Sequence, residues 1–184
     1  MNHKIARPKI SVYIATSIDG YIARKDGGLD WLESIPINPD EDYGFKDFMA
    51  SVDVLILGRN TYDVVSGFDE WPYQGKRVVV MSQKLKEVRE EAELFSGDIH
   101  ALLLKLHTEG TTHIYVDGGV IISKFLEMGL VDQIIITVIP TILGTGIRLF
   151  NPMINGHDCR LASSQSYPNG LVQLRYELKG AVPA

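Results

Sequence analysis

Cysteine is almost absent from this sequence, since Cys159 is the single thiol among 184 residues. One thiol excludes an internal disulfide framework and any zinc site built from cysteines. We expect Cys159 to be an inert thiol in the core. The five histidines are scattered along the chain, and His107 and His113 lack the spacing of a ligand pair on a helix. The sequence therefore predicts no metal site.

Long apolar runs and an excess of basic charge are also missing. The longest apolar runs, such as 52–57 and 134–139, have the length of strands and are too short to span a bilayer. The first residues lack the apolar core of a signal peptide. The formal charge is −5 with acidic and basic residues interspersed, which disfavours nucleic acid as a partner. These features predict a cytoplasmic globular protein without a membrane or nucleic-acid partner.

The chain does have a hydrophobic content of 45%, which is enough for one packed domain. We interpret residues 1–8 as a flexible N-terminal tail and 9–180 as a single domain. β-Branched runs alternate with amphipathic segments, which is typical of an α/β fold with parallel strands. The expected strands are 9–17, 52–57, 77–81, 92–95, 114–116 and 134–139, and the expected helices are 41–51, 99–107 and the segments that follow Gly58 and Gly119.

The C-terminal part has a different pattern. Two strand-like segments, 160–167 and 171–178, flank Pro168-Asn169-Gly170, which is a turn signal. The whole chain thus predicts an α/β fold, in which a mostly parallel mixed central sheet is flanked by helices and ends in an antiparallel hairpin.

Two strands end on glycine and pass directly into a helix. The strand 114–116 is followed by Asp117-Gly118-Gly119, and the strand 52–57 is followed by Gly58. Such a junction leaves backbone N–H groups at a helix N-terminus uncovered by side chains, which favours a phosphate. The sequence therefore predicts that a nucleotide's pyrophosphate lies on Gly118-Gly119. The alternative is that these glycines only allow a helix to pack closely on a strand.

Four segments together resemble one family. They are IATSIDGYIA (14–23), DVLILGRNTYD (53–63), VVVMSQK (78–84) and the segment 114–150. In this order they resemble the dihydrofolate reductase-like superfamily, and most of all stand-alone members of the RibD C-terminal domain family. That family is named for the reductase domain of the bifunctional riboflavin-biosynthesis deaminase–reductase. The resemblance covers most of 9–178 and implies the dihydrofolate reductase-like three-layer fold. The chain lacks His-x-Glu with Pro-Cys-x-x-Cys, which excludes the deaminase activity.

The resemblance implies NADPH as cofactor and assigns residues to it. The segment 58–61 would contact the diphosphate and the adenosine, while 82–84 would donate to the 2′-phosphate. Gly118-Gly119 would carry a cis peptide bond, and the loop 17–22 would close over the nicotinamide with Ala15 beneath it. The expected cofactor-binding residues are Ala15, Asp19, Gly20, Gly58, Arg59, Asn60, Thr61, Met81, Ser82, Gln83, Lys84, Asp117, Gly118, Gly119, Val120 and Ile121.

The implied reaction is hydride transfer from NADPH to a pteridine, aminopyrimidine or related heterocycle, as in 5-amino-6-(5-phosphoribosylamino)uracil reductase chemistry. Counting back from Gly58 at the family's spacing places the acid of true dihydrofolate reductases near Asp42, although a helix commonly carries such an acid in its first turn. Asp40 is a plausible cap of that helix. Trp31, Tyr43, Phe45 and Trp71 are expected in the substrate pocket, although aromatic residues in loops often only cover the core.

Two other functions stay open from the sequence. The first is a genuine dihydrofolate reductase, although 24–41 does not resemble a folate-binding helix. The second is a non-catalytic nucleotide-binding homodimer that kept the fold without the chemistry. Homodimerisation itself is implied by the resemblance, with the C-terminal strands as a possible interface.

Overall fold

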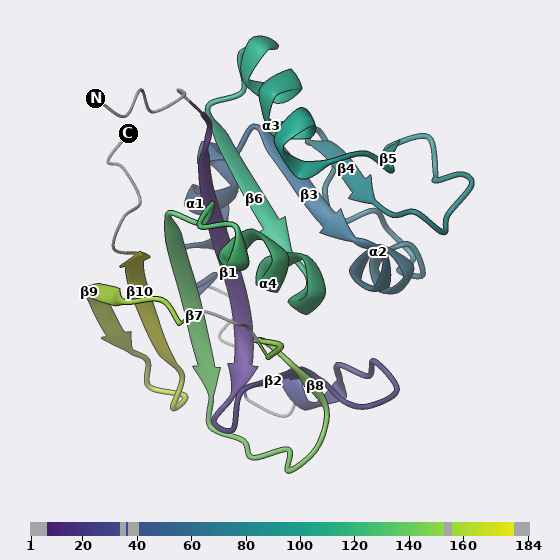
Figure 1. Cartoon of the computed structure of the whole chain (residues 1–184). Coiled ribbons are helices and arrows are strands. Elements are labelled where there is room, and N and C mark those ends of the chain that lie inside the picture. The colour runs from purple at the N-terminus through teal and green to yellow at the C-terminus, as the bar shows by residue number, and fades with distance from the viewer. Residues whose placement is uncertain (1–6, 34–35, 37–40, 153–155, 179–184) are drawn as a thin grey trace.

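The computed structural model describes residues 7–33, 36, 41–152 and 156–178. Its centre is an eight-stranded sheet with the order β5-β4-β3-β6-β1-β7-β10-β9 (Figure 1). The strands are β1 (Lys9–Ser17), β3 (Val54–Gly58), β4 (Arg77–Met81), β5 (Glu93–Phe95), β6 (His113–Asp117), β7 (Gln133–Ile139), β9 (Cys159–Ser166) and β10 (Val172–Leu178), and β2 (Tyr21–Ala23) pairs with β8 (Ile147–Arg148) in a separate ribbon. The helices are the short 3₁₀ helix η1 (Asp30–Leu32), α1 (Phe45–Ser51), α2 (Arg59–Val65), α3 (Ile99–Thr108) and α4 (Gly119–Glu127).

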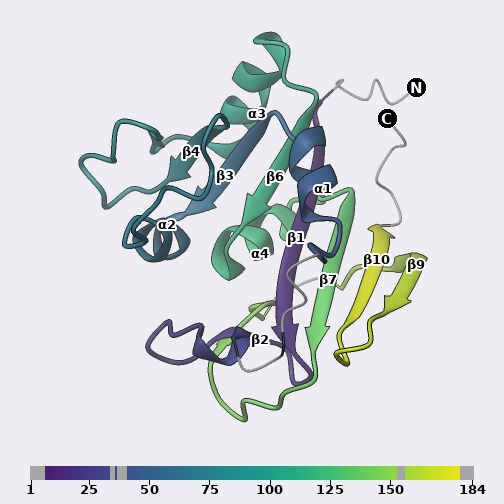
Figure 2. The ribbon, with the colours of Figure 1, turned by 180° about the vertical axis from the view of Figure 1, so that it is seen from behind.

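The inner strands are apolar because both faces of the sheet are covered. In β3, Val54 and Ile56 pack with α3 and α4, whereas Leu55 and Leu57 pack with residues of α1 and α2. The two views of the ribbon place α3 and α4 on one face and α1 on the other (Figures 1 and 2). Successive side chains of a strand point to opposite faces, so a run without alternation is what a covered strand requires. The predicted three-layer α/β fold is confirmed.

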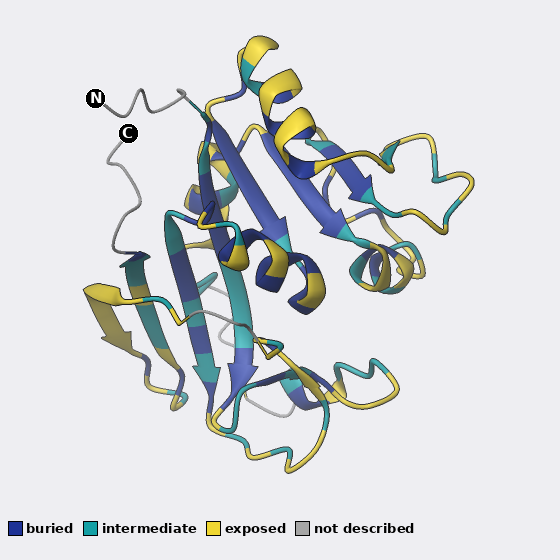
Figure 3. Ribbon diagram, in the orientation of Figure 1, coloured by how far each residue is buried: buried dark blue, intermediate teal, exposed yellow. Residues whose placement is uncertain are grey.

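The central strand β1 is uneven in its burial. It pairs with β6 only over Lys9–Ser11, but it pairs with β7 as far as Ser17. Val12 is fully buried, whereas 13–15 are only half-buried, although they lie in the middle of the sheet (Figure 3). β6 ends at Asp117, so the second half of β1 extends past its neighbour. The second half of β1 therefore has β7 as its neighbour in the sheet.

The C-terminal hairpin is confirmed and forms the edge of the sheet. β10 runs antiparallel to β7, and β9 pairs with β10 on the outside. Every residue of β9 is exposed (Figure 3). Cys159 therefore lies at the surface, and the prediction of a core thiol is wrong because neither face of the outermost strand is covered by a helix.

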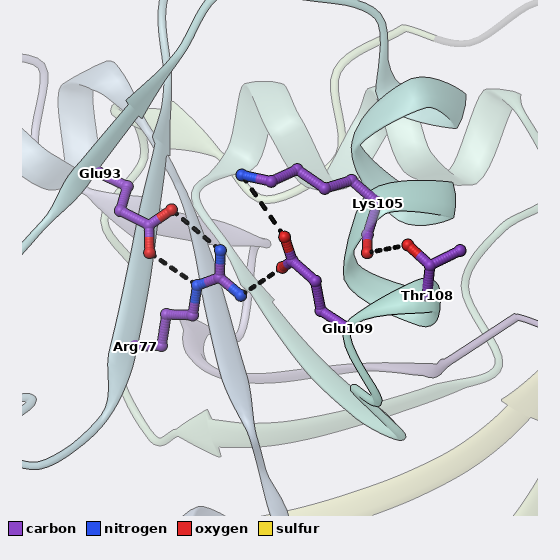
Figure 4. A network of polar contacts seen from close by, with 5 residues as sticks. All are labelled: Arg77, Glu93, Lys105, Thr108 and Glu109. Carbon is purple, nitrogen blue, oxygen red and sulfur yellow. Dashed lines mark hydrogen bonds and ion pairs between the residues drawn. The ribbon is translucent and has the colours of Figure 1, made fainter.

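The opposite edge is held by charged side chains. Arg77 of β4 donates to Glu93 of β5 at 2.6 Å and to Glu109, just after α3, at 2.7 Å (Figure 4). Lys105 lies 3.8 Å from Glu109 and adds a second cation. All of these groups are partly exposed, so each pair contributes about 1 kcal/mol or less. Their effect is to hold the short strand β5 and the end of α3 against β4.

The helix predicted over 41–51 begins only at Phe45. Tyr43 and Gly44 have φ of +57° and +81°, which no right-handed helix accommodates. Asp42 instead accepts hydrogen bonds from the N–H groups of Gly44 and Lys46 and so caps the helix. Asp40, the expected cap, lies outside the described residues. No helix in the described part of the chain is long and apolar enough to cross a membrane.

Candidate functional site

The carboxyl ends of three parallel strands meet at one edge of the sheet. In the β3–β4 register Gly58 lies opposite Met81, and in the β3–β6 register Leu57 lies opposite Asp117. The sheet thus brings together the three segments 58–61, 81–84 and 117–121, which carry most of the residues expected to bind the cofactor. This is the edge at which parallel α/β sheets bind their ligands.

The glycine pair at this edge has a packing role. Gly118 and Gly119 are both buried. A Cβ atom on Gly118 would lie 2.5 Å from the Oγ1 of Thr61, and one on Gly119 would lie 2.7 Å from the carbonyl oxygen of Arg148. α2 and the backbone of β8 therefore cover the two Cα atoms. Close packing explains the glycines, and the pair is not an open cradle for a phosphate.

The predicted cis peptide bond at Gly118-Gly119 is wrong, since no peptide bond within the described ranges is cis. Gly118 turns the chain through its own dihedral angles, with φ +115° and ψ +129°. Only glycine adopts such angles without strain, so a trans bond suffices to pass from β6 into α4. Val120, next in the first turn of α4, is exposed.

Two basic side chains lie near this edge without acidic partners. Arg59 begins α2, and Lys84 follows β4; both are exposed, and neither forms an ion pair with any described residue. By contrast, Arg77 and Arg89 each pair with a glutamate. The Oγ of Ser82 accepts N–H groups from Lys84 and Leu85, each at 3.1 Å. Its own proton remains to be donated, so the edge offers two cations and a hydroxyl to an anion.

Asp19 joins two loops. Its Oδ1 accepts from the Ser17 hydroxyl at 2.7 Å and from the N–H of Leu143 at 3.0 Å, while its Oδ2 accepts from the N–H of Gly144 at 2.7 Å. These bonds, that from Ser17 first, lower the pKa of Asp19. Gly20 continues the connection, because its carbonyl accepts from the N–H of Leu149. The structure thus gives Asp19-Gly20 the role of a turn with a capping carboxylate.

A cavity of about 210 Å³ opens beside the half-buried part of β1. Four residues named from the sequence line it, namely Ala15, Asp42, Tyr43 and Phe45, and the others are Tyr13, Leu32, Thr137, Ile139, Asn169 and Leu171.

The two tryptophans expected in the pocket lie elsewhere. Trp31 is buried in the adjoining core cluster with Ile139 and Leu171. Trp71 packs in a different cluster, where the Arg89 guanidinium lies 4.7 Å from the centre of its ring. Both residues cover the core, which was the alternative for aromatic residues in loops.

Polar groups missed by the sequence reasoning form one wall of the cavity. The Tyr13 hydroxyl donates to the carbonyl of Tyr43 at 2.7 Å and accepts from the Nε2 of Gln173 at 3.0 Å. The same amide nitrogen lies 3.2 Å from the Oγ1 of Thr137. Burial raises the pKa of Tyr13 to about 12, so its hydroxyl stays protonated. In the sequence, only Thr137, a polar residue inside the apolar run 134–139, could have indicated this polar wall.

The two carboxyl groups of the site differ in their protonation. Hydrogen bonds from the backbone N–H groups of Lys46, at 2.8 Å, and Gly44, at 3.1 Å, lower the pKa of Asp42. Asp42 therefore stays ionised, which suits a helix cap and not a proton donor. Burial raises the pKa of Asp117, at the end of β6, to about 6. Asp117 is thus the carboxyl that takes up a proton at a higher pH than an ordinary aspartate.

Among the residues that the structure describes, no group of three or more His, Cys, Asp or Glu side chains is placed to hold a metal ion.

Comparisons with known proteins agree on one family. The family model of the RibD C-terminal domain matches residues 8–173. A putative riboflavin biosynthesis protein from Shewanella sp. PV-4 has a solved structure that superposes with a TM-score of 0.88 at 39% identity, covering 93% of this chain and 99% of that one. The uncharacterized protein YwjB of Bacillus subtilis is 36% identical over 171 residues, which are 91% of this chain and 97% of YwjB.

Two relatives named RibD are longer than this chain and more distant. The riboflavin biosynthesis protein RibD of Corynebacterium ammoniagenes is 27% identical over 83% of this chain, which spans 49% of that protein. RibD of Acinetobacter baumannii shares the fold, with a TM-score of 0.69 at 18% identity over 94% of this chain and 58% of that one.

Proposed function

Because this chain belongs to the RibD C-terminal domain family, we propose that it is an NADPH-dependent reductase that transfers a hydride to a small pteridine-, aminopyrimidine- or related heterocyclic substrate. The observation that carries this proposal is the cavity at the half-buried part of β1. Tyr13 and Ala15 are half-buried in the middle of a covered sheet, and both line the cavity. Their strand β1 neighbours β6, whose last residue, Asp117, belongs to the edge formed by 58–61, 81–84 and 117–121. A cofactor at the edge and a substrate in the cavity would therefore be neighbours.

The residues at the edge fit NADPH. Its 2′-phosphate is a dianion, and Lys84, Ser82 and Arg59 supply unpaired positive charge and a hydroxyl donor. Asn60 and Thr61 add polar groups on α2. Because Gly118-Gly119 is covered, we assign the pyrophosphate to the backbone at the exposed Val120, the second residue of α4. NADPH supplies the hydride when it is bound.

The chain's own groups orient the substrate and hold the proton. Tyr13, Tyr43 and Phe45 provide aromatic walls around the cavity, and Ala15 leaves space on β1. Asp117, whose pKa is raised to about 6, is the carboxyl that is protonated most readily as the pH falls below neutral. Asp42, which stays ionised, contributes charge to the cavity wall and not a proton. This difference disfavours a genuine dihydrofolate reductase in which Asp42 would be the acid.

The cofactor assignment is tested at Lys84. Charge-assisted hydrogen bonds contribute about 1.5–3 kcal/mol, so Lys84→Ala should weaken NADPH binding about 10- to 100-fold while leaving NADH binding almost unchanged. Lys86→Ala removes the same charge two residues away, on another exposed side chain, and should change neither affinity. Titration of the unmodified protein and of both variants with NADPH and with NADH, followed by nicotinamide fluorescence, measures these affinities.

Equal weakening of NADPH and NADH by Lys84→Ala would show that Lys84 does not contact the 2′-phosphate. If neither NADPH nor NADP⁺ binds the unmodified protein, the reductase proposal fails and the non-catalytic alternative is favoured. Consumption of NADPH with one of a panel of heterocycles, followed at the nicotinamide absorbance band, would establish the reaction.

We also propose that two copies of the chain form a homodimer through β9. All eight residues of this strand are exposed, and the side chain of Leu161 is 49% exposed. An outermost strand has unpaired backbone N–H and C=O groups along its free edge, and natural proteins usually cover or pair such an edge. A second copy of β9 provides both the pairing and the apolar cover.

A further inference from the structure

The cavity beside β1 is small and mostly apolar. Its volume of about 210 Å³ is below the usual range for drug-sized ligands and suits one or two fused rings. Tyr13, Tyr43 and Phe45 bring aromatic rings to it, while Leu32, Ile139 and Leu171 provide aliphatic surface. Aromatic side chains favour flat rings that stack on them or meet them edge-on. The walls therefore suit a planar ring system.

The charge of the cavity wall has one sign. Asp42 is the charged residue among those that line it, and neither Lys nor Arg is among them. Glu41, next to Asp42 in the sequence, is a further acid. A phosphate or carboxylate in the cavity would lose its hydration and lie beside an ionised Asp42, with no cation among the residues that line the cavity. Lys46 acts electrostatically on Asp42 and Arg175 on Tyr13, but neither cation lines the cavity.

Asn169 and Asp42 provide hydrogen-bond acceptors in the wall, beside the hydroxyl groups of Tyr43 and Thr137, which can also donate. The Nδ2 of Asn169 donates to the Tyr43 hydroxyl at 2.9 Å and to the carbonyl of Pro36 at 3.2 Å. Because a carbonyl only accepts, the contact with Pro36 fixes which end of the Asn169 amide is nitrogen. The Oδ1 of Asn169 is buried, and no donor in the described part of the chain reaches it. Each oxygen of Asp42 accepts one backbone N–H and can accept another bond.

We infer that the cavity selects a neutral, planar, amino-substituted nitrogen heterocycle that carries neither phosphate nor carboxylate. Its ring and amino N–H groups would meet the oxygens of Asp42 and Asn169, and its faces would meet Tyr13 and Phe45. The inference rests on the proposed reductase function and narrows its substrate. It departs from a phosphoribosylated pyrimidine and from a folate with an anionic tail, because both bring a negative charge.

The test compares three related probes by calorimetric titration at pH 7, with and without NADP⁺. Pterin is neutral and carries an amino group, pterin-6-carboxylate adds a negative charge, and lumazine replaces the amino group by a carbonyl. We expect pterin to bind at least tenfold more tightly than either of the others. A site that accepts hydrogen bonds from an amino group rejects an analogue that brings another acceptor there.

Two variants distinguish the effect of the charge in the cavity wall from the effect of the protein's net charge. Asp42→Asn removes the charge in the wall and keeps a side chain that caps α1 equally well, so the preference for pterin over pterin-6-carboxylate should fall to threefold or less. Asp47→Asn removes the same charge from an exposed residue of α1 that does not line the cavity. It should leave the preference unchanged.

Several results would overturn the inference. They are equal binding of pterin and pterin-6-carboxylate, equal binding of pterin and lumazine, equal effects of Asp42→Asn and Asp47→Asn, or no binding of pterin at all. The binding of NADP⁺ itself tests the proposed reductase function separately from the selectivity of the cavity. If NADP⁺ fails to bind while pterin is selected as expected, the proposed reductase function fails and the selectivity of the cavity stands.

Discussion

The junction between β6 and α4 allows the sharpest test of the packing, through Gly118→Ala. Two separate costs are expected. A non-glycine residue at φ +115° costs about 1–3 kcal/mol in backbone strain. The new Cβ would also lie 2.5 Å from the Oγ1 of Thr61, and forcing such overpacking costs about 1–3 kcal/mol. The free energy of unfolding should therefore fall by about 2–6 kcal/mol.

Matched variants separate the two costs. Gly110→Ala replaces a glycine at φ +91° whose added Cβ would meet no atom within 4 Å, so it should show the backbone cost alone. Thr61→Ala removes the Oγ1 atom and leaves the Cβ of residue 61 at 3.5 Å. The double variant with Gly118→Ala should therefore recover about 1–3 kcal/mol compared with the sum of the single changes.

The measurement is urea unfolding of the four proteins of the cycle and of Gly110→Ala, with the free energy obtained by linear extrapolation. A coupling energy of zero within about 0.5 kcal/mol would refute the reasoning, because it would mean that Thr61 does not cover Gly118. The same conclusion follows if Gly118→Ala costs no more than Gly110→Ala. The cycle also yields Thr61→Ala for cofactor titration, which tests whether this residue contacts NADPH as well as Gly118.

Two further predictions concern pH and assembly. The folded-state pKa of Asp117 is raised from 3.8 to about 6, so its stabilising contribution is complete below about pH 4 and is lost as the pH rises through 6. In urea unfolding, Asp117→Asn should gain stability relative to the unmodified protein between pH 4 and 7, and a difference that does not change with pH would contradict the burial of this carboxyl. Leu161→Lys should shift sedimentation from dimer to monomer, whereas Leu104→Lys, at a 57% exposed position on α3, should not; a dimer that persists in both would place the interface away from β9.

Some features of the site could be predicted from the sequence because they depend only on residues that are close together along the chain. β-Branched runs that stop at Gly58 and at Asp117-Gly118-Gly119 indicated where β3 and β6 end, and the structure confirms both ends. The helix over 41–51 was predicted four residues too long, since apolar spacing alone does not reveal the positive φ angles of Tyr43 and Gly44.

Other features needed the folded chain. Both an anion cradle and a close helix–strand contact require glycine, so the pair Gly118-Gly119 did not distinguish them until Thr61 and Arg148 were placed over it. Trp71 looked like a pocket residue because it lies in a loop, but its position depends on Arg89 and the strands beneath it.

The amino-acid sequence by itself determined the periodicity of the strands, the glycine breaks between them, the C-terminal hairpin and the similarity to one family, because these are properties of short segments and their order. The tertiary structure alone decided which side chains share the cavity. Tyr13, Thr137 and Gln173 come from β1, β7 and β10, and they meet because the registers of those strands align them on one face. A shift of one residue in either register would turn the side chains of that strand to the opposite face, and no local signal in the chain sets that register.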